Sequence, residues 1–274
     1  MLASRVDDAA RVCRLQSLWS EAALRPVNES TIAMRGVLEG LCTELNATDG
    51  SWLVMRRHSA HEPKVSGENF SDVVEGMQGW SPVVAMYLNP DKVLRRVLER
   101  WFMHARRNGI DPMSKEVMKS AGRPRAYIRD DVATDEEWAG HWMARKFLNY
   151  YGVGERMVSV IPLADDCECV VLLDRPVDGD RFTVEDKHFF FMAISGLRSL
   201  HRNLSIERGA MFAKKPLSRR ERETYCHLLT SMSEAEIAER MGLSSHTVHD
   251  YARKLYRKFN VKGRVGLMAL AHGC

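Results

Sequence analysis

The sequence lacks the features that mark several large classes of protein. It has no apolar run of about 18 residues or more and no cationic-then-apolar leader, so we expect neither a membrane protein nor a secreted one. It also has no G-x-S-x-G elbow, no Walker-type glycine loop and no H-E-x-x-H motif. These absences predict a protein that is not an enzyme and that needs no cofactor.

Cysteine is present but does not form a recognisable pattern. Six cysteines are scattered through 274 residues, and only Cys167 and Cys169 form a close pair, C-x-C. Neither the other cysteines nor the ten histidines supply a second half-site at metal-ligand spacing. The simpler interpretation is a pair of ordinary strand residues, with a metal or redox site as the alternative. We expect a cytoplasmic protein with free thiols.

Charge is distributed unevenly along the chain. Residues 214–274 hold twelve of the 40 Lys and Arg residues and six of the 36 Asp and Glu residues, a net charge of +6. Residues 1–213 therefore carry a net charge of −2. A small cationic module joined to a nearly neutral larger one is typical of a chain whose tail binds a polyanion. A merely solvated basic surface is the alternative.

The first two hundred residues alternate between helical and strand-like patterns. Apolar residues at spacings of three and four predict two helices before residue 46, separated by Pro26, an amphipathic helix over 90–107 and a long helix over 185–206. Short β-rich runs predict strands at 51–57, 82–88, 126–128, 156–162 and 168–174, the last two joined as a hairpin. Gly209 and Pro216 then interrupt the periodicity, and we place a domain boundary there.

The last sixty residues carry two capping boxes. Ser218-x-x-Glu221 predicts the start of one helix and Ser233-x-x-Glu236 the start of a second, because the hydroxyl and the carboxylate of each box satisfy backbone N–H groups. Gly242 follows the second helix where a left-handed cap is needed. The sequence therefore predicts two short helices and a tight turn.

A third helix is predicted from Ser244 or Ser245 to about Phe259. Its apolar residues fall on one stripe: Val248, Ala252, Leu255 and Phe259. The other face is polar and cationic: His246, His249, Asp250, Arg253, Lys254, Arg257 and Lys258. A helix of this kind fits the major groove of double-stranded DNA. A last helix, about 264–271, is expected to pack Val265, Leu267, Met268 and Leu270 behind the others.

This segment resembles the LuxR-type helix-turn-helix family over about 55 residues. The resemblance is carried by four runs: residues 217–223 (LSRRERE), 236–241 (EIAERM), 244–248 (SSHTV) and 256–261 (YRKFNV) with Arg264. It implies a four-helix DNA-binding domain that acts as a dimer on a two-fold symmetric site. Two residues depart from the family pattern: Ser231 replaces a usual glycine, which is expected to strain the turn, and Tyr251 replaces a frequent histidine.

The resemblance also assigns roles by position. It implies that His249, Asp250 and Arg253 lie at base edges. It places the phosphate contacts at Thr247, Lys254, Arg257 and Lys258, with His246 beside them on the same face.

The larger domain weakly resembles sensory domains of the GAF or PAS kind. The resemblance implies a small-molecule effector, and four aromatic residues are candidates to line its pocket: Trp138, Trp142, Tyr150 and Tyr151. Three alternatives stay open: an acyl-homoserine-lactone receptor, whose Asp-Pro appears at Asp111-Pro112 without the usual tyrosine; a phosphoacceptor receiver domain; and a ligand-free dimerisation or protein-interaction module. In the last case the interface is expected on the 185–206 helix, at Phe190, Ile194, Leu197 and Leu204.

Together these patterns predict an α+β chain with two domains. Residues 1–206 form a GAF/PAS-like α/β sensory or dimerisation domain, 207–216 a linker, and 217–274 an all-α four-helix LuxR-type helix-turn-helix domain. We expect a sequence-specific transcriptional regulator that binds double-stranded DNA as a homodimer.

Overall fold

The computed structural model describes residues 2–58, 74–89, 101, 103–213 and 215–273. The chain divides into two compact units, one made of residues 1–19 and 35–198 and the other of residues 20–34 and 199–274. The second unit thus contains the expected linker, the carboxy-terminal helices and a short stretch from near the amino terminus.

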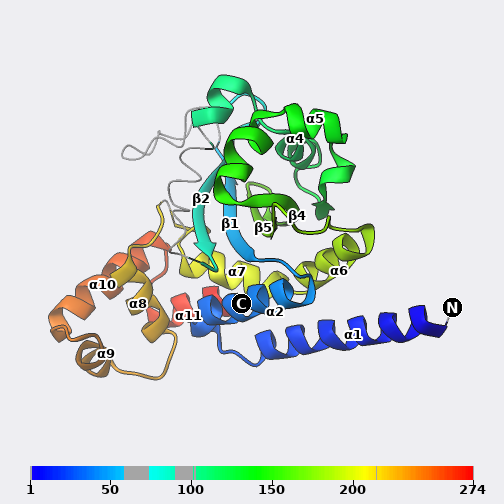
Figure 1. Ribbon diagram of the computed structural model, residues 1–274. Helices are drawn as coiled ribbons and strands as arrows, with labels where there is room; N and C mark the ends of the chain where they lie inside the picture. The colour runs from blue at the N-terminus through cyan, green and yellow to red at the C-terminus, as the bar shows by residue number, and fades with distance from the viewer. Residues whose placement is uncertain (1, 59–73, 90–100, 102, 214, 274) are drawn as a thin grey trace. The chain divides into compact units, whose positions relative to one another are not determined.

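A five-stranded antiparallel sheet forms the centre of the first unit (Figure 1). Its strands are β1 (Asp49–Arg57), β2 (Trp80–Tyr87), β3 (Arg125–Tyr127), β4 (Val153–Ala164) and β5 (Cys167–Pro176), in the order β2-β1-β5-β4-β3. All five strands predicted from the sequence are confirmed, and Asp165 and Asp166 form the turn of the β4–β5 hairpin. Cys167 and Cys169 are buried residues of β5, and burial raises the pKa of the Cys167 thiol to about 12.

Both faces of the sheet are covered, which explains why β1 is buried over six consecutive residues. Leu53 and Met55 belong to one apolar cluster, which includes Trp101, Trp138 and Trp142. Trp52 and Val54, which alternate with them, are fully buried outside that cluster. Helix α4 packs against β3 and the 143–148 turn against β4, while α6 packs against β3 and β4.

The remaining elements of the first unit are helical. They are α1 (Leu2–Ala23, up to Trp19), α2 (Ser30–Glu44, from Arg35), α4 (Pro112–Lys119), η2 (Arg129–Asp131), α5 (Asp135–Gly140), η3 (Met143–Leu148), η4 (Asn149–Tyr151) and α6 (Val184–Ser195). Of the helix expected over 90–107, residues 101 and 103–107 lie within the described residues and are helical. Gly109, where this helix is expected to end, has a left-handed backbone with a φ of +79°. Residues 90–100 and 102 lie outside the described part.

The expected long helix over 185–206 is wrong, because two helices occupy this range. Helix α6 ends at Ser195 and α7 begins at Arg198. The indole N–H of Trp19 donates to the Ala193 carbonyl at 3.0 Å, and the Leu197 N–H donates instead to Ile194 O at 3.1 Å. The side chain of Trp19 thus donates to the carbonyl that the Leu197 N–H would meet in a continuous helix.

The burial of α6 also removes the interface expected on it. Phe190 and Ile194 have no exposed surface, and α6 packs onto the sheet. Their periodicity reflects contact with the core of the first unit, so they do not offer a free surface to a partner.

The second unit is all-helical. It holds η1 (Val27–Glu29), α7 (Arg198–Glu207), α8 (Arg219–Leu228), α9 (Glu234–Met241), α10 (Ser245–Lys258) and α11 (Arg264–His272). The two predicted capping boxes and the left-handed Gly242 cap, with a φ of +63°, are confirmed. Two expectations are wrong: Val265 is 82% exposed instead of packed, and Ser231 is not among the described residues with a left-handed backbone, so the turn is not strained there.

The mixed α+β class is confirmed by the sheet of the first unit and the helices of the second. The finer likeness of the first unit to a GAF or PAS domain stays a prediction.

Candidate nucleic-acid interface

Helix α10 is anchored on one side and open on the other. Ser244 caps its start, since its hydroxyl accepts from the Thr247 N–H at 3.1 Å. The predicted apolar stripe is confirmed, because Val248, Ala252 and Leu255 have no exposed surface and Phe259 has 4%. Phe259 packs on Tyr225 of α8 with ring centroids 5.7 Å apart. The buried stripe fixes which side chains of α10 face outward.

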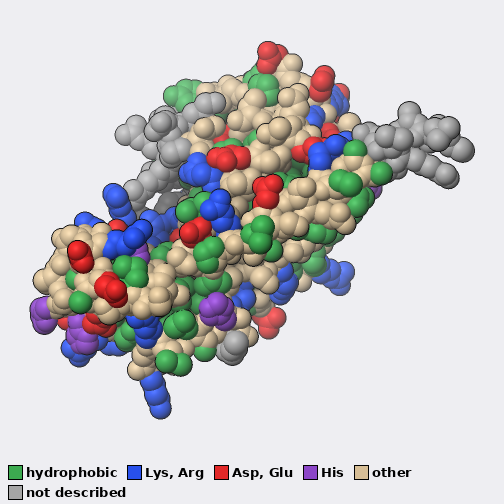
Figure 2. Space-filling model, turned by 90° about the horizontal axis from the view of Figure 1, so that it is seen from below, with side chains coloured by type: hydrophobic (Ala, Val, Ile, Leu, Met, Phe, Trp, Pro, Cys, Tyr) green, Lys and Arg blue, Asp and Glu red, His purple; other side chains and the backbone are tan. Residues whose placement is uncertain are grey.

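The outward face of α10 presents cations to solvent. Arg253, Lys254 and Arg257 are all exposed, and the Lys254 ammonium lies 5.4 Å from the centre of the Tyr251 ring. Tyr251, which departs from the family pattern, thus supports a cationic side chain by a cation–π contact. Figure 2 shows Lys, Arg and His side chains gathered with a few acidic ones on the part of the surface formed by α8, α9 and α10.

Lys258 differs from the other predicted phosphate contacts because an acidic side chain holds it. Its ammonium donates to the Glu221 carboxylate at 2.9 Å, and the side chain of Glu221 is 10% exposed. Burial alone would raise the pKa of Glu221, but the hydrogen bonds from Lys258 and from the Ser218 N–H lower it below its usual value. Lys258 therefore ties the end of α10 to the start of α8, and its contact with phosphate stays a prediction.

The remaining predicted residues lie together on the first turns of α10. The Ser244 and Thr247 hydroxyls are 2.8 Å apart. His246 Nε2 lies 3.8 Å from an oxygen of Asp250. His249 Nδ1 lies 3.0 Å from a carboxylate oxygen of Glu234, on the first turn of α9.

Sequence reasoning missed Glu221 and Glu234 as partners of the outward face. The sequence explains Glu221 by its capping box alone, but Glu221 also meets Lys258, 37 residues later. Glu234 meets His249 across the turn between α9 and α10. Neither pair has a helical spacing, so only the packing of the helices brings them together.

Arg264, the first residue of α11, connects this helix to the end of α8 and to the turn that follows α8. The Arg264 guanidinium donates to the carbonyls of Leu228 at 2.8 Å and Met232 at 2.5 Å, and also to that of Thr230. These carbonyls lie at the end of α8 and in the turn after it, where a helix leaves acceptors unsatisfied. Arg264 therefore fixes the turn that precedes α9.

The aromatic residues proposed to line a ligand pocket separate in the structure. Trp138 and Trp142 are buried in the apolar cluster of the first unit and Tyr151 packs against it. Tyr150 is 69% exposed and lies outside it. The Trp142 indole donates to Gly109 O at 3.1 Å and stacks on His104. Whether the three inner aromatics contact a ligand stays a prediction.

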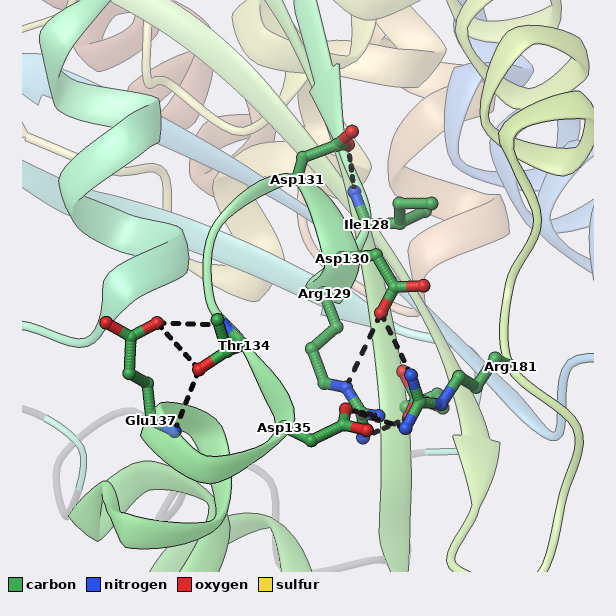
Figure 3. A network of polar contacts seen from close by, with 9 residues as sticks. Ile128, Arg129, Asp130, Asp131, Thr134, Asp135, Glu137 and Arg181 are labelled. Atoms are coloured by element: carbon green, nitrogen blue, oxygen red, sulfur yellow. Dashed lines mark hydrogen bonds and ion pairs between the residues drawn. The ribbon is translucent and has the colours of Figure 1, made fainter.

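An open depression on the first unit lies elsewhere, beside a network of ion pairs (Figure 3). Its lining residues are Asp130, Val132, Ala133, Thr134, Asp135, Glu137 and Arg181. Asp135 accepts from Arg129 at 2.8 Å and from Arg181 at 2.7 Å. Arg129 also pairs at 2.6 Å with the buried Glu155. Since these charges largely neutralise one another, the network serves to hold η2 and α5 to the sheet.

Metal sites and membrane spans are both absent from the described part of the chain. Within the described ranges, no three His, Cys, Asp or Glu side chains gather in a way that could hold a metal ion. No helix in the described part of the chain is both long and apolar enough to cross a bilayer.

The chain has a general likeness to several solved structures. SdiA in complex with octanoyl-rac-glycerol has a TM-score of 0.48 and 13% identity, over 95% of this chain and 93% of that one. Escherichia coli SdiA has a TM-score of 0.45 and 16% identity, over 96% and 97%. The VqsR LBD domain from Pseudomonas aeruginosa has a TM-score of 0.41 and 13% identity, over 71% and 94%. At these scores no ligand or site is carried over to this chain.

Comparison with families is more specific. No protein with a curated description matches the chain significantly. The family model described as "Bacterial regulatory proteins, luxR family" matches residues 215–271, which contain α8, α9, α10, all of α11 except His272, and every predicted DNA contact. The carboxy-terminal segment of this chain therefore resembles the domain of the luxR family of bacterial regulatory proteins.

Proposed function

We propose that the chain is a transcriptional regulator that binds a specific DNA sequence as a dimer, with α10 in the major groove. No catalytic step is part of this proposal. The observation that carries it is the division of α10 between a fully buried stripe and an exposed face with Arg253, Lys254 and Arg257. Such a face supplies base-edge donors near the start of a helix and phosphate contacts along its length.

Two features of the domain support this use of α10. The start of α10 is capped by Ser244, so its first turn is rigid where base edges would be read. Its far end is tied to α8 by the Lys258–Glu221 pair. A preorganised helix loses less conformational entropy on binding than one that must first be ordered.

Selection of duplexes from random DNA by the full chain tests this function. We expect enrichment of one sequence with two-fold symmetry and half-sites about one helical turn apart. Arg253→Ala is expected to change the enriched sequence, and Arg257→Ala is expected to leave it unchanged while weakening all binding. Failure to enrich any sequence at low ionic strength would contradict the proposal.

For the first unit, we propose binding of a small apolar effector on the tryptophan-rich side of the sheet. The indole N–H of Trp80 is buried in that cluster and has no hydrogen-bond partner among the described residues. A buried donor without a partner is costly, and a ligand acceptor at this point would satisfy it. Trp138 and Trp142 lie in the same cluster and would line such a site.

Thermal melting of the full chain with a panel of medium-chain metabolites, each bearing a carbonyl group, tests the effector. A compound at a hundred times its Kd should raise Tm by several degrees. Trp80→Phe, which keeps a ring but removes the N–H, should reduce the rise. If no compound raises Tm and the chain sediments as a dimer without additions, the first unit is instead a ligand-free dimerisation module.

A further inference from the structure

Glu234 and His249 form a pair that spans the turn between α9 and α10. A carboxylate oxygen of Glu234 lies 3.0 Å from His249 Nδ1, and the side chains are 37% and 54% exposed. His249 is on the second turn of α10, and it is one of the three residues predicted to meet base edges. The Nε2 atom is the other nitrogen of the same ring, so it is the one left for DNA.

We infer that Glu234 is a positioning residue that makes His249 select an amino-bearing base, adenine or cytosine, at one position of each half-site. This inference deepens the proposed function and rests on it. An ionised carboxylate only accepts hydrogen bonds, so Nδ1 must be the donor in this pair. In the neutral ring, Nε2 then carries no proton and acts only as an acceptor.

The major groove separates the four bases by this property. Adenine N6 and cytosine N4 are donors there, while guanine O6 and thymine O4 are acceptors. An imidazole Nε2 that can only accept finds a partner on the first two bases and faces a second acceptor on the others. The Glu234–His249 pair thus lets His249 distinguish amino bases from keto bases on the strand that it contacts.

A purely stabilising role predicts something different for Glu234. An exposed ion pair contributes little to stability, and its loss would leave base preference unchanged. A general electrostatic role would also act alike on all sequences, because removing one negative charge near DNA strengthens every complex. A change of base preference at one position therefore distinguishes a positioning role of Glu234 from a stabilising role and from a general electrostatic role.

The experiment uses the full chain at pH 8.5, above the ordinary pKa of imidazole, about 6.5. Bound duplexes are selected from random DNA with the wild type and with Glu234→Gln, Glu239→Gln and His249→Ala. Glu239 is an exposed residue of the same helix, so its variant removes the same charge without touching His249. The base pair that loses its preference in His249→Ala marks the position read by His249.

At that position we expect the wild type and Glu239→Gln to favour adenine or cytosine over guanine and thymine by about fivefold to tenfold, the low end for one base-edge contact. Glu234→Gln should lose most of this preference, because a carboxamide can either donate to Nδ1 or accept from it. Long-range ¹H–¹⁵N spectra of the free protein should show the proton on Nδ1 in the wild type.

Four results would overturn the inference while leaving the proposed function intact: no position altered by His249→Ala, a preference for guanine or thymine, a preference unchanged in Glu234→Gln, or equal loss in Glu239→Gln. A wild type that selects no sequence at all would refute both.

Discussion

The link between Glu221 and Lys258 makes a quantitative prediction about the stability of the second unit. Glu221→Gln keeps an acceptor for the Ser218 N–H, so the capping box survives while the charge is lost. Lys258→Met keeps the length of the side chain and removes the ammonium. A double-mutant cycle with these two changes isolates the pair, because each change leaves the other contacts of its residue in place.

We expect a coupling free energy of about 1 kcal/mol. The Glu221 and Lys258 side chains are 10% and 30% exposed, which places the pair between exposed ion pairs, about 0.2–1 kcal/mol, and charged hydrogen bonds, about 1.5–3 kcal/mol. The matched control is Arg220 with Glu223, on the same helix and also at 2.9 Å, with side chains 48% and 36% exposed. Its coupling should be about 0.2–0.5 kcal/mol.

The coupling should depend on pH in one direction. The pKa of Glu221 is lowered in the folded state, so its contribution is fully present above the ordinary glutamate pKa, about 4.3, and is lost as pH falls through the folded value. Urea unfolding at pH 7 and at stepwise lower pH measures both effects. If the two substitutions change the free energy of unfolding additively at pH 7, the assignment of Lys258 to this contact is refuted. A coupling free energy no larger than that of the control pair would refute it as well.

Four further substitutions test other parts of the structure. Arg253→Ala should cost about 1–3 kcal/mol of affinity for the selected duplex and much less on random DNA, measured by gel shift. Arg257→Ala should weaken both equally and lower the slope of log affinity against log salt by about 1. Arg264→Met, which frees three carbonyls, should destabilise the second unit by about 2–3 kcal/mol in urea. Arg125→Met, which leaves the buried Glu168 without its cationic partner at 2.8 Å, should cost the first unit about 3–5 kcal/mol.

Local signals were sufficient to predict the carboxy-terminal helices. The capping boxes at Ser218 and Ser233 and the glycine at 242 each act within four residues, so their effect can be read directly from the sequence. The buried stripe of α10 follows from its period alone. The same reasoning found the strands of the first unit, because each is a short run between turn residues.

Contacts between distant residues account for what the sequence did not predict. At the break between α6 and α7, Ala193 meets Trp19, which lies 174 positions earlier in the chain. The exposure of Val265 depends on which face of α11 meets the other helices. The partners of Lys258 and His249 are likewise set by helix packing. Periodicity describes one helix at a time and carries no information about such pairs.

Methylation interference on the selected duplex tests most directly whether α10 reads the major groove. Guanine N7 lies in the major groove and adenine N3 in the minor groove, and one reagent methylates both. If α10 lies in the major groove, N7 methylation within each half-site should block binding, N3 methylation there should not, and Arg253→Ala should remove the interference at one guanine. Interference confined to adenine N3, or a pattern unchanged by Arg253→Ala, would contradict it.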